Sequence, residues 1–196
     1  AAMPAFPNAD KSPGYATRVQ TVLVGGVSYQ IRSLADLQQF HDPEQAAERA
    51  GISSATWPLF GSIWPSGLML AEIMHAKNLD GLKILELGCG LGIASLIASS
   101  RGAKITASDY HPLANEFLIE NAKINYMQAV QFHICDWNKP VTGLGKFDLI
   151  IGSDLLYEPD HPGLLSRFID VHSSATVNVI IVDPGRRQQA KFKRNM

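Results

Sequence analysis

The chain has 196 residues, with 17 lysines and arginines against 18 aspartates and glutamates, so that its formal net charge is −1. Hydrophobic residues make up 46% and charged residues 18% of the sequence, which is the composition of a globular domain with a sizeable core. These values exclude a disordered tail, a fibre and a disulfide scaffold, and without a positive field we expect no nucleic-acid partner.

The N-terminal part of the chain is predicted to form a hairpin followed by short helices. The segment Arg18–Arg32 holds two β-rich runs around Gly25-Gly26, a dipeptide typical of primed hairpin turns. Helices are predicted over Ser33–Phe40 and over Pro43–Ala50, the second because its proline suits a first helical turn.

An uncharged stretch over residues 51–71 separates this arm from the rest of the chain. A run of this length is long enough to cross a membrane, but two prolines and two glycines interrupt it, so we expect no membrane span. Ala55–Gly67 is predicted to be a loop, with a helix after it. We therefore expect an N-terminal arm over residues 1–50 and a main domain over residues 51–196.

From residue 82 onward, apolar strand-like segments alternate with helix-like segments. The predicted strands are Leu82–Leu87, Lys104–Ala107, Val130–Ile134, Phe147–Gly152 and Val177–Val182, and the predicted helices are Ile93–Ser99, Pro112–Asn125 and Pro162–Val171. Strands that alternate with helices form a parallel sheet covered on both faces. The predicted fold class is therefore α/β, a doubly wound and mostly parallel sheet with an N-terminal extension.

A glycine-rich turn follows the first strand of this sheet, in the sequence Glu86-Leu-Gly88-Cys-Gly90-Leu-Gly92. The glycines permit a tight turn and leave the backbone open to a ligand, while the next helix adds amide donors. The dinucleotide fingerprint G-x-G-x-x-G fits poorly, because counting from Gly88 puts the bulky Ile93 at its last position. Glu86 suits an amine-bearing ligand better than a pyrophosphate. A plain strand–helix turn is the alternative.

This pattern resembles the seven-strand, Rossmann-like class of methyltransferases that depend on S-adenosylmethionine (SAM). The resemblance implies SAM as cofactor and S-adenosylhomocysteine (SAH) as product, with Glu86 at the methionine end and the turn Gly88–Gly92 passing under it. In this class the second strand lies between the first and third, so Cys89 and Cys135 are predicted to be free thiols. We expect no metal site and interpret most of the six histidines as surface or capping residues.

Two further acids follow the second and third strands. Asp109, about 20 residues after the glycines, is predicted to accept hydrogen bonds from the ribose hydroxyls. The alternative is an N-cap for the helix that begins at Pro112. By the resemblance, Asp136 is expected to read the adenine amino group and Trp137 to stack on the ring. Simple packing under a loop is the alternative for Trp137.

The fourth strand runs into Asp154-Leu-Leu-Tyr157. Because ligands of parallel sheets bind beyond the carboxyl ends of the strands, Ser153–Pro159 is expected to face the methyl donor. Methyltransferases that act on amide or base nitrogens carry two prolines there, which this chain lacks. A capped loop with a buried aromatic ring is the alternative.

The Asp-x-x-Tyr segment narrows the resemblance to the family-16 protein methyltransferases, which mostly modify lysines. Three further segments match that family: Ile63-Trp64-Pro65-Ser66-Gly67, Asp109-Tyr110, and Asn121 in the next helix. The resemblance spans roughly Trp57–Arg187. It implies that Asp154 orients the amine, that Tyr157 walls the methyl-transfer channel, and that Trp64 covers the cofactor or flanks the acceptor. Desolvation must lower the pKa of a lysine before it attacks, so we expect positioning to carry most of the rate.

The family's sheet has two more strands after the fifth, and the fourteen residues that follow Val182 do not supply them. Either the sequence is a piece of a longer chain, or a partner chain, which would make a dimer possible, or the N-terminal hairpin covers the edge of the fifth strand. The basic residues from Arg186 to Arg194 are interpreted as the start of a helix, or as an arm for an acidic partner.

We predict a cytoplasmic, SAM-dependent N-methyltransferase that acts on a protein lysine, without a membrane or nucleic-acid partner. A small-molecule N-methyltransferase acting on a small amine is the first alternative, and a non-catalytic SAM-binding module is the second. An NAD oxidoreductase is disfavoured by Glu86 and Ile93.

Overall fold

The computed structural model describes residues 14–139, 141–155 and 160–185. Tyr157 and the basic residues after Gly185, both singled out in the sequence, lie outside the described residues.

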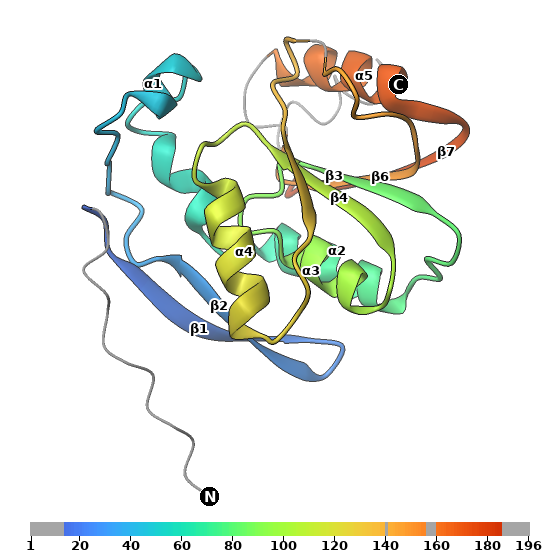
Figure 1. Cartoon of the computed structure of the whole chain (residues 1–196), viewed down its shortest axis with the longest axis horizontal. Coiled ribbons are helices and arrows are strands. Elements are labelled where there is room, and N and C mark those ends of the chain that lie inside the picture. The colour runs from blue at the N-terminus through green and yellow to red at the C-terminus, as the bar shows by residue number, and fades with distance from the viewer. Residues whose placement is uncertain (1–13, 140, 156–159, 186–196) are drawn as a thin grey trace, which may run out of the picture.

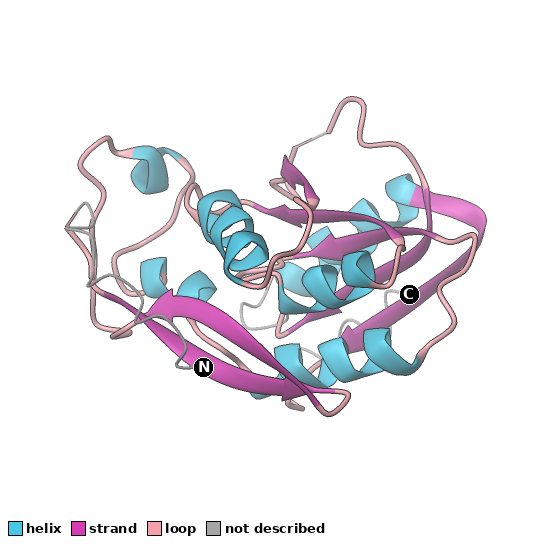
Figure 2. Ribbon diagram, turned by 60° about the horizontal axis from the view of Figure 1, so that its bottom comes forward, coloured by secondary structure: helices cyan, strands magenta, loops and turns pink. Residues whose placement is uncertain are grey.

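The predicted N-terminal hairpin is confirmed. Strands β1 (Thr17–Val24) and β2 (Val27–Leu34) are antiparallel, and Val24 lies opposite Val27 across the two-glycine turn. Figure 2 shows this pair as a ribbon separate from the main sheet.

The helices predicted after the hairpin are largely wrong. Residues 35–40 are not helical, because Ala35 N extends the ladder to Ala16 O at 2.9 Å and the Asp36 carboxylate accepts from Gln38 N at 2.7 Å. Such side-chain turns compete with a helix. Of the second predicted helix, Pro43–Ala50, only the four residues of α1 (Ala46–Arg49) are helical.

The stretch predicted to be a loop contains a 3-10 helix, η1 (Trp57–Gly61), and the start of α2 (Pro65–Ala76). Proline stands in the first turn of both, where its missing N–H costs nothing. The helix predicted to follow this stretch is thus confirmed with an earlier start.

The predicted α/β sheet is confirmed. Its strands and helices are β3 (Lys83–Leu87), α3 (Ile93–Ser100), β4 (Lys104–Asp109), α4 (Ala114–Ile124), β5 (Gln131–Ile134), β6 (Phe147–Ser153), α5 (His161–His172) and β7 (Ser173–Val182). The order is β5-β4-β3-β6-β7 and every pairing is parallel (Figure 1). Since β4 lies between β3 and β5, the two cysteines are apart, and both are buried free thiols as predicted.

Helices cover both faces of the sheet, and β3 shows how. Ile84 points into a core shared with α2, α3, α4 and the hairpin, whereas Leu85 and Leu87 point into a second core shared with α5. The alternation of side chains along a strand thus supplies both faces.

The hairpin packs against α4 and α2, and β7 pairs only with β6 among the described strands. The alternative in which the hairpin covers the edge of the last strand is therefore wrong. Within the described residues, no helix combines the length and apolar character needed to span a membrane.

Candidate active site

A cavity of about 520 Å³ lies at the carboxyl ends of the parallel strands. Most of the residues predicted to form the site line it: Trp64, Gly88, Gly90, Asp109, Asp136, Trp137 and Asp154. A smaller hollow of about 40 Å³ holds Glu86 and Gly92. The two spaces share Trp64, Gly90 and Ser153 as lining residues, so they adjoin.

The glycine turn between β3 and α3 is closely packed from two sides. Gly88, Gly90 and Gly92 all have positive φ, at 56°, 54° and 73°. A Cβ on Gly90 would lie 2.9 Å from the carbonyl oxygen of Phe60 in η1. Glycine is therefore required at Gly90 both by its backbone conformation and by the neighbouring chain.

Glu86 is a buried carboxylate at the end of β3, and it accepts a hydrogen bond from the Ser95 hydroxyl of α3. Its pKa is raised from 4.5 to about 7, chiefly by burial and also by the nearby Asp109, while the hydrogen bonds from Ser95 act to lower it. Among the described residues, Glu86 forms no ion pair. This chemistry fits a cationic group in the smaller hollow, where an ammonium would stabilise the ionised form.

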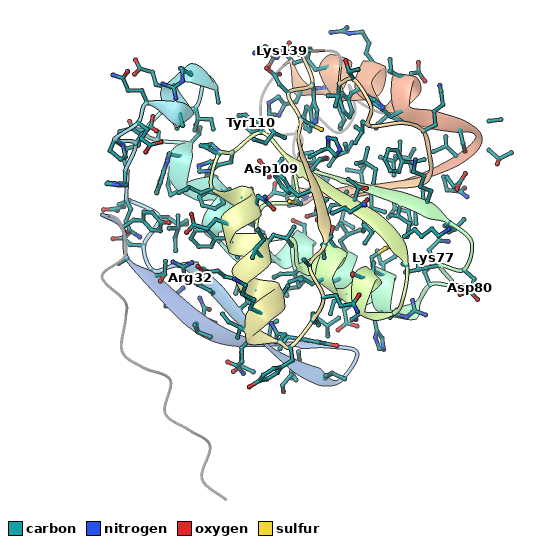
Figure 3. The ribbon with its side chains drawn as sticks, in the orientation of Figure 1. Arg32, Lys77, Asp80, Asp109, Tyr110 and Lys139 are labelled. Atoms are coloured by element: carbon teal, nitrogen blue, oxygen red, sulfur yellow. The ribbon has the colours of Figure 1, made fainter. Side chains whose placement is uncertain are left out.

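Asp109 ties the glycine turn to the end of β4, where Figure 3 shows it beside Tyr110. Its two carboxylate oxygens accept from Gly90 N at 2.8 Å and from His111 N at 2.9 Å. Its pKa is raised by burial, although these backbone bonds lower it. Helix α4 begins at Ala114 without a side-chain cap, so the alternative role as N-cap is wrong.

Asp136 and Trp137 line the cavity beyond β5. Asp136 accepts from Asn138 N at 2.9 Å and pairs with Lys139 at 3.6 Å. The Trp137 ring meets His161 edge-on, with centroids 5.4 Å apart, and also packs against the second core. Trp137 thus lines the cavity and also makes the packing contacts of the alternative, and its stacking on an adenine ring stays a prediction.

The remaining predicted positions frame the opposite wall. Asp154 has φ +55° and donates its N–H to Val182 O at 2.9 Å, which fixes its backbone against β7. Trp64 precedes α2 and donates its indole N–H to Leu59 O at 2.9 Å. Both side chains line the cavity, whereas Tyr157 lies outside the described residues.

His111 lines the cavity but was not predicted to be part of the site. His111 is buried and stacks on Phe60, with centroids 3.8 Å apart and planes 23° apart. Burial lowers its pKa from 6.5 to about 3. Most of the histidines were interpreted as surface or capping residues. His111 and His172 are buried and thus not surface residues, although the His111 ring accepts from Leu113 N at 3.1 Å just before α4. The only signal in the sequence was the place of His111 two residues after Asp109.

Part of the wall also comes from the junction between the N-terminal arm and the main domain, through Ala50, Gly51, Ser53 and Thr56. No motif predicted these positions. In the part of the chain that the structure describes, no group of three or more His, Cys, Asp or Glu side chains is placed to hold a metal ion.

Comparison with known sequences gives a family match. Residues 53–196 match the family model described as lysine methyltransferase. The protein N-lysine methyltransferase METTL21A of Xenopus tropicalis is 27% identical over 83% of this chain and 80% of its own length. The electron transfer flavoprotein beta subunit lysine methyltransferase of Mus musculus is 32% identical over 72% of this chain. The chain spans 56% of that relative.

Solved structures show the same fold. A putative SAM-dependent methyltransferase from Streptococcus mutans has a TM-score of 0.64 at 16% identity, covering 97% of this chain and 47% of that one. The T. thermophilus 16S rRNA methyltransferase RsmC, in complex with AdoMet and guanosine, also has a TM-score of 0.64 at 16% identity, covering 96% of this chain and 47% of that one.

Proposed function

The chain belongs to the lysine methyltransferase family, and from this membership we propose that it is a SAM-dependent N-methyltransferase whose acceptor is a protein lysine. The observation that carries the cofactor assignment is the Glu86 carboxylate, which is buried beside the glycine turn, accepts from the neutral Ser95 hydroxyl and forms no ion pair among the described residues. The names of the relatives, which describe protein lysine methyltransferases, support a protein acceptor.

The proposal gives each end of SAM its own set of residues in the cavity and the adjoining hollow. In the proposal, Glu86 binds the ammonium of the methionine end, and Gly88, Gly90 and Gly92 let that end approach the backbone. When bound, SAM supplies an activated methyl group on its sulfonium.

The nucleoside end is assigned to the neighbouring strand ends. Asp109 accepts from the ribose hydroxyls, Asp136 reads the adenine amino group, and Trp137 offers a ring face to the base. Trp64 covers the cofactor from the side of α2.

The acceptor side of the cavity is acidic. Asp154 and Asp160 line the cavity there, and no lysine or arginine stands among the described lining residues. Such a wall attracts a cationic side chain, and a closed, dry site lowers the pKa of a lysine so that a lone pair becomes available. We assign to Asp154 the role of orienting that amine, and to Tyr157 the wall of the channel.

The proposal also covers the domain organisation of the chain, its location in the cell and its oligomeric state. We keep the division into an arm over residues 1–50 and a cofactor-binding domain over residues 51–196. A cytoplasmic location is supported by the two buried free thiols. A second copy pairing along β7 is part of the proposal only if that edge is open in the whole protein.

The test uses the full chain, methyl-tritiated SAM and a cell extract, with acid-insoluble counts separated from soluble counts. Label in a discrete protein band, recovered as methyllysine after hydrolysis, would support the proposal. Label recovered as methylarginine, or only in the soluble fraction, would overturn the lysine acceptor. SAH binding without any transfer would favour the non-catalytic module.

A further inference from the structure

The hairpin is joined to the main domain by side-chain amides that take the place of a neighbouring strand. Asn121, fully buried on α4, accepts from Arg32 N at 2.7 Å and donates to Arg32 O at 3.1 Å. Asn125 accepts from Gln30 N at 2.8 Å and donates to Gln30 O at 2.7 Å. The edge of β2 that faces away from β1 is thus paired with α4.

The spacing on the two elements makes this pairing possible. Four residues rise about 6 Å along a helix, and two residues span about 6.7 Å along a strand. Asn121 and Asn125 therefore repeat at nearly the same interval as Arg32 and Gln30. In β2 these two residues direct their N–H and C=O groups to the same edge.

Two further contacts hold the hairpin in this position. The Arg32 guanidinium pairs with Glu120 at 2.7 Å and lies over the Phe117 ring, 4.7 Å from its centroid, where Figure 3 shows it between the hairpin and α4. At the turn, the Glu72 carboxylate of α2 accepts from Gly25 N at 3.0 and 3.1 Å.

The hairpin in turn supports the wall of the cavity. Leu34, the last residue of β2, packs so closely on Gly61 of η1 that a Cβ there would clash with it. The Phe117 ring meets Phe60 edge-on, with centroids 5.1 Å apart. The carbonyl of Phe60 lies against Gly90, so η1 is wedged between the hairpin, α4 and the glycine turn.

We propose that Asn121 and Asn125 are positioning residues for the cofactor site. By holding β2 on α4 they set the place of η1 against the glycine turn, and thereby the affinity of the cavity for its ligand. They do not line the cavity, so they act through Phe60 and Gly90. The inference rests on the proposed function in taking SAH as the probe.

The experiment uses the full chain with Asn121→Leu, Asn121→Asp and Asn125→Ala. SAH affinity is measured by calorimetry, and amide hydrogen exchange is followed at Gln30, Arg32 and Gly90. We expect SAH to bind roughly 3- to 30-fold more weakly in Asn121→Leu, with faster exchange at all three amides. Asn121→Asp can still accept from Arg32 N but can no longer donate to Arg32 O. Its SAH affinity is therefore expected to lie between those of Asn121→Leu and the wild type.

Ile169→Val in the second core is the matched control, because it lowers stability on the far face of the sheet. If the asparagines are positioning residues, their variants should have a raised KM for SAM and an unchanged kcat. In the control variant both KM and kcat should stay at the wild-type values. If Asn121→Leu does not fold, Asn125→Ala carries the test, because Asn125 is only half-buried.

Faster exchange at Gln30 and Arg32 with unchanged SAH affinity and unchanged Gly90 exchange would overturn the inference. A wild-type chain that binds no SAH would instead overturn the proposed function. In that case exchange at Gly90 alone decides whether the asparagines position the turn.

Discussion

The Ser95 hydroxyl donates to the buried Glu86 carboxylate, and no basic side chain among the described residues forms an ion pair with that acid. Burial raises the Glu86 pKa from 4.5 to about 7. Between these two pH values the folded chain binds more protons at this group than the unfolded chain does. The group therefore lowers the free energy of unfolding as the pH rises through that window.

Glu86→Gln is expected to stabilise the ligand-free protein and to weaken its ligand affinity. Removing a carboxyl with this shifted pKa raises the free energy of unfolding at pH 8 by up to roughly 3 kcal/mol, and by little at pH 4.5. Urea unfolding at the two pH values measures the change, with the exposed Asp80→Asn as control. Equal SAH affinity in Glu86→Gln and wild type would remove Glu86 from the site.

SAH affinity is also expected to depend on pH through Glu86. In the proposed site the ammonium of the ligand would bind the ionised Glu86 carboxylate, which is the minor form below about pH 7. Affinity should fall as the pH drops below 7, approaching tenfold for each unit. Calorimetry from pH 5.5 to 8.5 checks this slope, and a flat profile in wild type would contradict it. Glu86→Gln should show no such slope.

Gly90→Ala is expected to damage the turn more than a glycine replacement elsewhere with a similar backbone. Gly102 also has positive φ, at 80°, but nothing lies within 4 Å of an added Cβ there. Gly102→Ala should cost about 1–2 kcal/mol from the backbone alone. Gly90→Ala adds the displacement of the Phe60 carbonyl, about 1–3 kcal/mol more, and should weaken SAH binding. An equal loss of stability in the two variants would mean that η1 can move away from the added methyl group at little energetic cost.

The sheet, and the gathering of the site residues at one edge of it, could be predicted because both follow from local patterns in the sequence. Apolar runs alternating with helices define parallel strands, and the carboxyl ends of such strands meet at one edge. Asp109 and Asp136 were expected there and line one cavity in the structure, with Glu86 in the adjoining hollow. Their roles toward a ligand stay predictions.

The features that were missed depend on contacts far apart in the sequence. Asn121 and Arg32 are 89 positions apart, and no spacing rule connects a helix amide to a strand backbone at that range. The burial of His111 follows from Phe60, which belongs to the segment predicted to be a loop. Residues 33–40 have helical composition, but the ladder from Ala35 to Ala16 prevails over it.

Asp154→Asn is expected to separate turnover from cofactor binding. Asparagine adopts positive φ readily, so the backbone at φ +55° is kept while the negative charge is lost. We expect methyl transfer to fall roughly 100-fold with SAH affinity within about twofold of wild type. Single-turnover kinetics measure the rate of methyl transfer, and calorimetry measures the SAH affinity. Retained transfer would assign the orientation of the amine to another residue.

His111→Phe is expected to reduce the sensitivity of the fold to acid. The His111 pKa is lowered from 6.5 to about 3, so between these values the unfolded chain takes up a proton that the folded chain refuses. Stability is therefore lost as the pH falls through that window, by roughly 3 kcal/mol between pH 7 and pH 4. Phenylalanine keeps a flat ring on Phe60 but cannot take up that proton. Between pH 7 and pH 4 the wild type should therefore lose roughly 3 kcal/mol more of its free energy of unfolding than His111→Phe does. NMR of the wild type should find His111 neutral down to about pH 4, and a titration near pH 6.5 would contradict its burial.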